Sequence, residues 1–156
     1  MPSWAVNTMN AFDFEYMNWV ALAVAIVANF VIGFVWYAGW FPTGKMWMGY
    51  MGMDPKAKPD SGEMMKGLVM MLVGSFLMML ALGLTVGKKV SGGGITVHQN
   101  DVGELMGWAL LFWMGFMVPQ LLGSLAWEKR PMGLVAINGG YQLVNILVAG
   151  LIFATL

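Results

Sequence analysis

Cysteine is absent from this sequence of 156 residues, and charged residues and histidine are scarce. Without a thiol the chain can form no disulfide, iron–sulfur cluster or thiolate metal site. Charged residues make up 10% of the chain and apolar residues 59%, whereas soluble domains average about 25% and 45–50%. Eight Lys and Arg balance eight Asp and Glu, and no clustered basic face offers a site for nucleic acid. This composition is typical of a protein that is surrounded by lipid.

Four long apolar stretches exclude every charged side chain of the sequence. They cover approximately residues 18–40, 67–86, 105–127 and 133–156. An α-helix needs about 20 apolar residues to cross a hydrocarbon core about 30 Å thick. A charge at the centre of such a helix costs about 2.5–3.5 kcal/mol on insertion scales. The sequence therefore predicts an all-α fold, a single integral membrane domain built as a bundle of four transmembrane helices.

Residues that flank the stretches predict where three of these helices begin. Asp60 with Glu63, and Asp101 with Glu104, have the spacing of a capping box, in which each side chain accepts from an exposed backbone N–H. Pro131 suits the first turn of the fourth helix, where its missing N–H is no loss. The first helix has three possible starts, at Asn10, Asp13 and Asn18.

The first loop contains a further helical pattern. Thr43 is a candidate cap for a short helix from residue 44 to about residue 53, before Pro55. Its apolar side chains recur at helical spacing: Met46, Trp47, Tyr50, Met51 and Met53. This pattern predicts a helix that lies in the membrane interface. The tail before Asn18 is aromatic and is also expected to lie along the membrane surface.

The loops differ in their number of basic residues, which predicts the orientation. The first and third loops together hold six Lys and Arg, the second holds two, and the tails hold none. The positive-inside rule places the first and third loops in the cytoplasm and both termini in the periplasm or outside the cell. Because the N-terminal tail lacks Lys and Arg, we expect no cleaved signal peptide.

Small residues recur on each predicted helix and let neighbouring backbones approach closely. The candidate packing positions are Gly67, Gly74, Ala81, Gly83, Gly87, Gly107, Gly115, Gly123 and Gly140. Faces of this kind either close the bundle or join neighbouring copies. The sequence leaves both uses open.

Amides form the main polar feature of the apolar stretches. Together with one tyrosine they are Asn29, Gln120, Asn138, Tyr141, Gln142 and Asn145. One interpretation is a polar pocket open to the cytoplasm, with Tyr37 or Tyr141 at its mouth. The favoured interpretation is interhelical hydrogen bonding, worth about 0.6 kcal/mol per contact, because no ionisable group lies among these amides. Pro119 and the sequence Asn138-Gly139-Gly140 are expected to loosen the third and fourth helices.

Methionine is unusually frequent, with seventeen residues. Four of them cluster in the first loop: Met46, Met48, Met51 and Met53. Thioethers can bind Cu(I), but methionine also fills irregular gaps and suits an interfacial helix, which is the favoured interpretation. His98, the single histidine, is expected to be an ordinary loop residue.

Three blocks of the sequence carry a resemblance to a known family. The first runs from Asn18-Trp19 through Gly33 to Trp36-Tyr37, and the second is Lys45-Met46-Trp47 after Pro42. The third combines Pro119, Trp127-Glu128-Lys129-Arg130 and Ile137-Asn138-Gly139-Gly140-Tyr141. In these blocks the chain resembles the bacterial membrane family known as domain of unknown function 1761. The resemblance implies a small four-helix protein of the bacterial inner membrane, with no activity to transfer.

No catalytic motif is present, so the sequence predicts a protein that is not an enzyme and has no cofactor. We expect a structural or accessory membrane subunit that associates with copies of itself or with other membrane subunits. A small-solute channel or transporter that uses the amides of the fourth helix is the alternative. Copper(I) handling by the methionine-rich loop is a third, less favoured possibility.

Overall fold

The computed structural model describes residue 14 and residues 17–54, 60–86 and 102–156. Within these ranges the chain is helical and contains no strand. The elements are α1 (Trp19–Trp36), α2 (Pro42–Met51), α3 (Ser61–Val86), α4 (Val102–Phe112), the π-helical turn η1 (Trp113–Met117), α5 (Val118–Ala126) and α6 (Met132–Thr155). The predicted all-α class is confirmed.

Four helical segments are long and apolar enough to cross a membrane. They are Trp19–Trp36, Met65–Thr85, Val102–Ala126 and Met132–Thr155, with a mean hydropathy of 2.3, 2.3, 1.6 and 1.6. The third span is the continuous rod formed by α4, η1 and α5. Each segment coincides with one apolar stretch of the sequence, so the fold is that of a multi-pass membrane protein.

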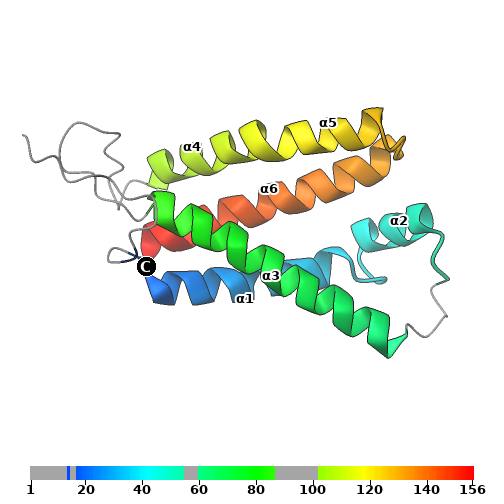
Figure 1. The fold of residues 1–156 in the computed structure, drawn as a ribbon, viewed down its shortest axis with the longest axis horizontal. Helices are drawn as coiled ribbons and strands as arrows, with labels where there is room; N and C mark the ends of the chain where they lie inside the picture. The colour runs from blue at the N-terminus through cyan, green and yellow to red at the C-terminus, as the bar shows by residue number, and fades with distance from the viewer. Residues whose placement is uncertain (1–13, 15–16, 55–59, 87–101) are drawn as a thin grey trace, which may run out of the picture.

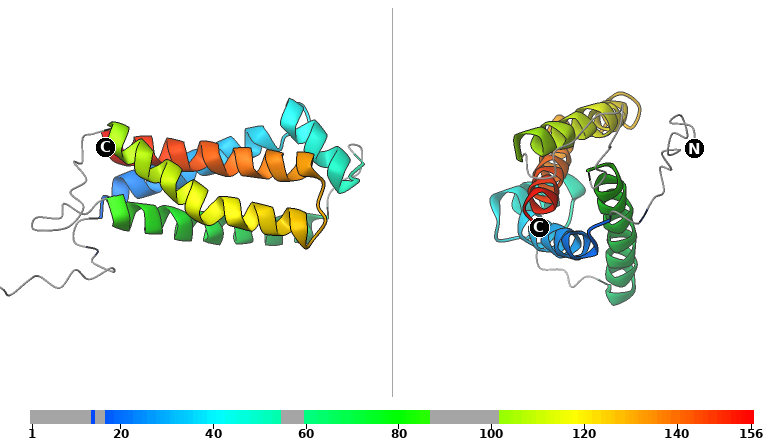
Figure 2. Two further views of the ribbon diagram at one scale, coloured as in Figure 1. Left: turned by 90° about the horizontal axis from the view of Figure 1, so that it is seen from above. Right: turned by 90° about the vertical axis from the view of Figure 1, so that its left-hand side faces the viewer.

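Helix α6 is the central element of the structure. It packs along α1 on one side and along α4, η1 and α5 on the other, and it also touches α3. Figure 2 shows this arrangement from the end of the molecule, with α6 between α1 and α4 and with α3 beside α1. Because α6 has neighbours on several sides, it holds ten buried residues, more than any other described helix.

The spanning helices alternate in direction. The start of α1 and the C-terminus lie at one end of the molecule, and α2, the end of α5 and the start of α6 lie at the other (Figure 1). The first and third connections therefore share one end, as four consecutive crossings require.

Asn18 is the residue that starts α1. Its Oδ1 accepts a hydrogen bond from the Ala21 N–H at 2.9 Å, the capping contact that stabilises a helix N-terminus. Asp60 similarly accepts from the Gly62 N–H at 2.9 Å before α3. The Glu63 side chain and residue Asp101 lie outside the described part of the chain, so the reciprocal half of each capping box stays a prediction.

Helix α2 begins two residues earlier than the sequence suggested. Pro42 occupies its first turn and Phe41 is the capping residue, because proline has no N–H to satisfy and its fixed φ suits that position. Thr43 is not a cap; its hydroxyl donates to the carbonyl of Trp36 and ties α2 to the end of α1. The helix ends at Gly52, whose φ of 64° is a left-handed conformation that glycine adopts without strain.

The apolar core lies toward the end that holds the C-terminus. Small residues bring α1, α4 and α6 together there: Ala21, Ala25, Ala109 and Ala149 are each at most 1% exposed. At Gly150 an added Cβ would lie only 3.2 Å from the Cβ of Ala109. Larger side chains, including Met79, Leu105 and Phe153, fill the space around them.

Candidate functional site

A chain of three polar side chains connects α1 to α3 and α6. The Asn29 Nδ2 donates to Ser75 Oγ at 2.7 Å, and the Tyr141 hydroxyl donates to Asn29 Oδ1 at 2.7 Å. Asn29 and Ser75 are buried, at 3% and 8% exposure. Both ends of the Asn29 amide are therefore satisfied by neighbouring helices. Each bond joins helices that are far apart in the sequence. This series of hydrogen-bonded side chains therefore fixes the register of the three helices.

Gly33 allows the Tyr141 hydroxyl to reach Asn29. A Cβ added at Gly33 would lie 2.9 Å from Tyr141 Oη, closer than carbon and oxygen normally approach. Gly33 is also one turn along α1 from Asn29. The close approach of α1 and α6 at this level consequently requires a glycine.

A second contact group joins the end of α1 to α2 and α6. The Tyr37 hydroxyl donates to Asn138 Oδ1 at 3.0 Å. The Tyr37 ring lies between Trp47 of α2 and Tyr141 of α6, with centroid distances of 5.2 and 5.1 Å and edge-on geometry. Aromatic pairs of this geometry are favourable beyond their buried area. Tyr37 therefore links α2 to the polar chain of the core.

Two tryptophan indoles bind carbonyls on the N-terminal half of α6. Trp36 Nε1 donates to the Ile137 carbonyl and Trp113 Nε1 to the Gly139 carbonyl, each at 3.1 Å. Helix α6 nevertheless remains continuous from Met132 to Thr155. The prediction that residues 138–140 loosen the helix is therefore wrong. Each indole adds a hydrogen bond to a carbonyl that stays within the helix.

Two buried oxygen atoms on α6 have no hydrogen-bond donor in the described part of the chain. They are Gln142 Oε1 and Asn145 Oδ1. Asn145 is 1% exposed, and its Nδ2 donates to the Tyr141 carbonyl one turn earlier at 3.1 Å. An unsatisfied buried acceptor is unfavourable, so each of these atoms can accept a hydrogen bond from a water molecule or from a bound donor.

The six predicted site residues separate into three groups. Asn29, Asn138 and Tyr141 bond to other helices, and Gln142 and Asn145 are at least half-buried on α6. Gln120 does not join them, because it lies exposed on α5 in a surface hollow of about 410 Å³. The π-helical turn η1 lies before Gln120 and rotates α5 relative to a continuous α-helix. It ends two residues before Pro119, at which the sequence predicted a loosened third helix.

The sequence did not predict the hydrogen bonds made by Ser75, Trp36 and Trp113. A signal existed for Ser75, because it and Thr85 are the hydroxyl side chains of the stretch 67–86. Which carbonyl each indole reaches depends on how the helices cross.

The predicted packing glycines divide between the interior and the outer surface. Gly83 and Gly140 are close to other elements: an added Cβ would lie 2.8 Å from Met17 Sδ and 3.2 Å from the Trp36 ring, respectively. Five others would meet no atom within 4 Å: Gly67, Gly74, Gly107, Gly115 and Gly123. Ala81 is exposed, and Gly87 lies outside the described residues. Most of the predicted packing face of α3 therefore points away from the chain.

The four clustered methionines lie on α2 or just after it. Met48 contacts Gly39, where its Sδ would lie 3.3 Å from an added Cβ. Met46, Met51 and Met53 are 53%, 48% and 47% exposed. Cu(I) binding by these thioethers stays a prediction, and His98 lies outside the described residues.

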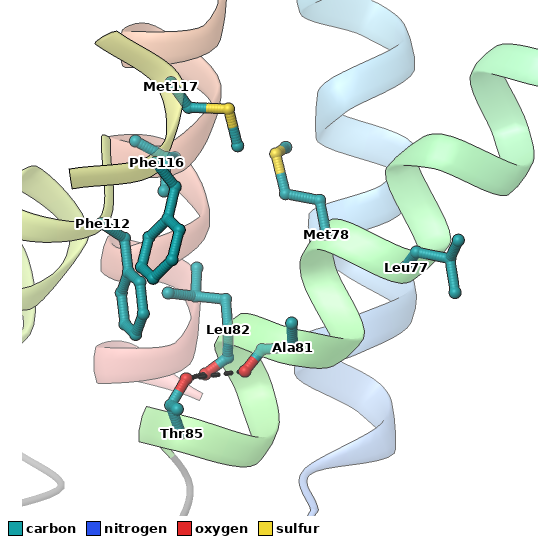
Figure 3. A pocket seen from close by; sticks show the side chains of 9 residues that line it. Leu77, Met78, Ala81, Leu82, Thr85, Phe112, Phe116 and Met117 are labelled. Atoms are coloured by element: carbon teal, nitrogen blue, oxygen red, sulfur yellow. Dashed lines mark hydrogen bonds between the residues drawn. The ribbon is translucent and has the colours of Figure 1, made fainter. Parts of the chain in front are cut away.

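A second hollow, of about 420 Å³, opens between α3 and the third span, with Ile146 of α6 also lining it. Its walls include Met78 and Leu82 on α3 and Phe112 and Phe116 opposite, as Figure 3 shows. Thr85 is the polar residue of this lining, and its hydroxyl donates to the carbonyls of Ala81 and Leu82. The hollow is thus an apolar cleft within the spanning region.

In the described part of the chain, the interior side chains form neutral hydrogen bonds. Their polar groups are amides, hydroxyls and indoles. Within the described ranges no three His, Cys, Asp or Glu residues gather as a metal site would require. The arrangement can hold helices in register or bind a neutral polar molecule.

The fold and this interior define a multi-pass membrane protein of four apolar spans. A family model described as "Protein of unknown function (DUF1761)" matches residues 20–154. The chain belongs to this family, which confirms the resemblance seen in the sequence. No curated protein and no solved structure matches the chain.

Proposed function

We propose that this protein is a non-enzymatic membrane subunit that acts by packing against copies of itself or against other membrane helices. The observation that carries the proposal is a contrast between the interior and the outer surface. The Asn29 and Asn138 amides bond to neighbouring helices of the same chain, whereas five glycines of α3 and the third span have open space around them. In lipid, faces with small residues allow helices to approach closely.

The electrostatics agree with a packing role. The charged residues lie outside the apolar stretches, and proton-coupled transport usually needs an ionisable group at membrane depth. The basic bias of the first and third loops supports an inner-membrane location, with those loops in the cytoplasm.

Transport of a small neutral solute is the second candidate function. Gln142 Oε1 and Asn145 Oδ1 favour it, because both are buried acceptors without a donor. A polar solute or water that passed between α6 and its neighbours would satisfy them. Asn29 and Asn138 do not share this feature, because their side-chain oxygens accept from Tyr141 and Tyr37.

One preparation distinguishes the two candidates. The protein is extracted in mild detergent and moved into lipid nanodiscs, and the mass of the particle is measured by native mass spectrometry. We expect two or more protein chains in each particle. A particle that contains one copy and no other membrane subunit contradicts the packing proposal.

The same protein, reconstituted into vesicles, is tested for glycerol and urea permeation. A packing subunit gives no flux above that of protein-free vesicles. Flux that the variant Asn145→Leu abolishes, with its insertion unchanged, supports transport instead.

A further inference from the structure

The π-helical turn η1 determines which side of α5 faces outward. Inward contacts of the third span recur at multiples of four residues: Leu105 and Ala109 are fully buried, Trp113 bonds to Gly139, and Leu121 packs against Gly139. In a regular α-helix each four-residue step turns the side chain about 40° further, so sixteen residues would rotate it about 160°. The wider π-helical turn between Trp113 and Met117 removes part of this rotation. Leu121 therefore still faces α6.

One row of residues is consequently left on the outside of the third span. Gln120, Gly123 and Trp127 follow each other at spacings of three and four residues. Trp127 is 88% exposed, Gln120 is exposed, and an added Cβ at Gly123 would meet nothing within 4 Å. We call this row the outer seam. Alternating steps of four and three are the spacing by which two helices pack along a common seam.

Gln120 is the polar residue of the outer seam. It precedes Ala126, the last residue of the span, by six residues, which is about 9 Å along a helix axis. The 25-residue span is about 37 Å long and exceeds the hydrocarbon core of about 30 Å, so Gln120 lies inside that core when the span is centred. Its amide makes no hydrogen bond within the described part of the chain. An unpaired amide that faces lipid tails is unfavourable.

We infer that the outer seam is an interface with a second copy of this chain, in which the two Gln120 amides bond to each other. A two-fold axis along the membrane normal brings identical residues of two copies together at the same depth. An amide carries both a donor and an acceptor, so the Gln120 amides of two copies can bond to each other. A lipid tail offers neither a donor nor an acceptor. The hollow of about 410 Å³ formed beside Gln120 by Pro119, Gly123 and Ser124 permits close approach. This inference rests on the proposed self-association and identifies its surface.

Cysteine cross-linking tests the inference, because the natural chain has no cysteine. The variants Gly123→Cys and Gly74→Cys are compared in native membranes under oxidation. Both glycines have open space around them, so neither substitution disturbs the fold, but Gly74 lies on α3, away from the outer seam. We expect disulfide-linked dimers for Gly123→Cys and few or none for Gly74→Cys.

A second variant tests the amide itself. Gln120→Leu keeps the size of the side chain and removes its hydrogen bonds, and we expect it to weaken dimer formation in nanodiscs about threefold to thirtyfold. Gln120→Asn, which retains an amide, should weaken it less. If Gln120→Leu dimerises as well as the natural chain, the amide pair is refuted and Gln120 is satisfied by lipid headgroups.

The outcomes also separate this inference from the proposed function. An oligomer that cross-links through Gly74→Cys and not through Gly123→Cys overturns the outer seam and leaves the packing function intact. A particle that contains one copy and no other membrane subunit, with no cross-link at either position, overturns both.

Discussion

Asn29 uses both ends of its amide, which makes it the residue on which the arrangement of α1, α3 and α6 most depends. It donates to Ser75 and accepts from Tyr141. In a membrane the hydrophobic effect does not distinguish helix–helix contacts from helix–lipid contacts, so such bonds and close packing select the partner helix. A polar side chain within a span is therefore as informative about structure as it is about function.

At the same scale, Gly33→Ala should destabilise the protein by about 1–2 kcal/mol. The added Cβ lies 2.9 Å from Tyr141 Oη, so the hydroxyl must move and its bond to Asn29 is weakened or lost. The free energy of unfolding is measured by denaturation in mixed detergent micelles.

Two variants serve as controls for this prediction. Gly74→Ala adds the same methyl group in open space and should leave stability unchanged or slightly raised, because alanine is the better helix former. In a Tyr141→Phe background the cost of Gly33→Ala should fall, since the hydroxyl that it displaces is gone. Equal costs in both backgrounds would show that the hydroxyl contact does not matter.

At the scale of elements, the attachment of α2 to α6 is the most specific contact. Tyr50 of α2 lies directly over Gly133, where an added Cβ would overlap its hydroxyl. Tyr37, at the end of α1, also bridges the two elements, because its ring contacts Trp47 of α2 and Tyr141 of α6. Helix α2 is thus held by side chains and is not a free connector.

Gly133→Ala should therefore displace α2 and raise the hydrogen exchange of its backbone amides, while the exchange of α6 stays slow. The added methyl group and the Tyr50 hydroxyl cannot occupy the same space. Gly49→Ala is the matched control, because it lies on α2 with no atom within 4 Å. Exchange in α2 that is equally slow in the natural chain and in Gly133→Ala would contradict this arrangement.

At the scale of the whole molecule, the alternating helices predict which residues share a membrane side. Lys45 on α2 and Lys129 after α5 are exposed at the end shared by the first and third connections, and the C-terminus lies at the other end (Figure 1). Single cysteines at 45 and 129 should react with a membrane-impermeant maleimide from the cytoplasmic side. A cysteine at exposed Leu156 should react from the opposite side. Labelling of residues 45 and 129 from different sides would overturn the four-crossing topology.

Many residues of the candidate site could be recognised from the sequence because they are polar. Which of them bond to each other could not be predicted. Asn29, Asn138 and Tyr141 were identified because polar residues are rare in apolar stretches. Ser75 as the partner of Asn29, and Tyr37 as the partner of Asn138, depend on the rotation and the depth of separate helices. Apolar helices of this kind are exposed to lipid on much of their surface, so periodicity gives little information about which face turns inward.

The sequence by itself determined that lipid surrounds the protein and that the chain has four spans. Four stretches of about 20 residues without charge are favourable only in lipid. It also determined the start of α1 as one of three positions and the family to which the chain belongs. The tertiary structure decided that Asn18 is that start, that Gly33 admits Tyr141, and that Gln120 faces outward. The physical reason is that charge and the length of an apolar stretch can be read along the sequence. Which side of each helix turns inward depends on contacts between helices and on one π-helical turn.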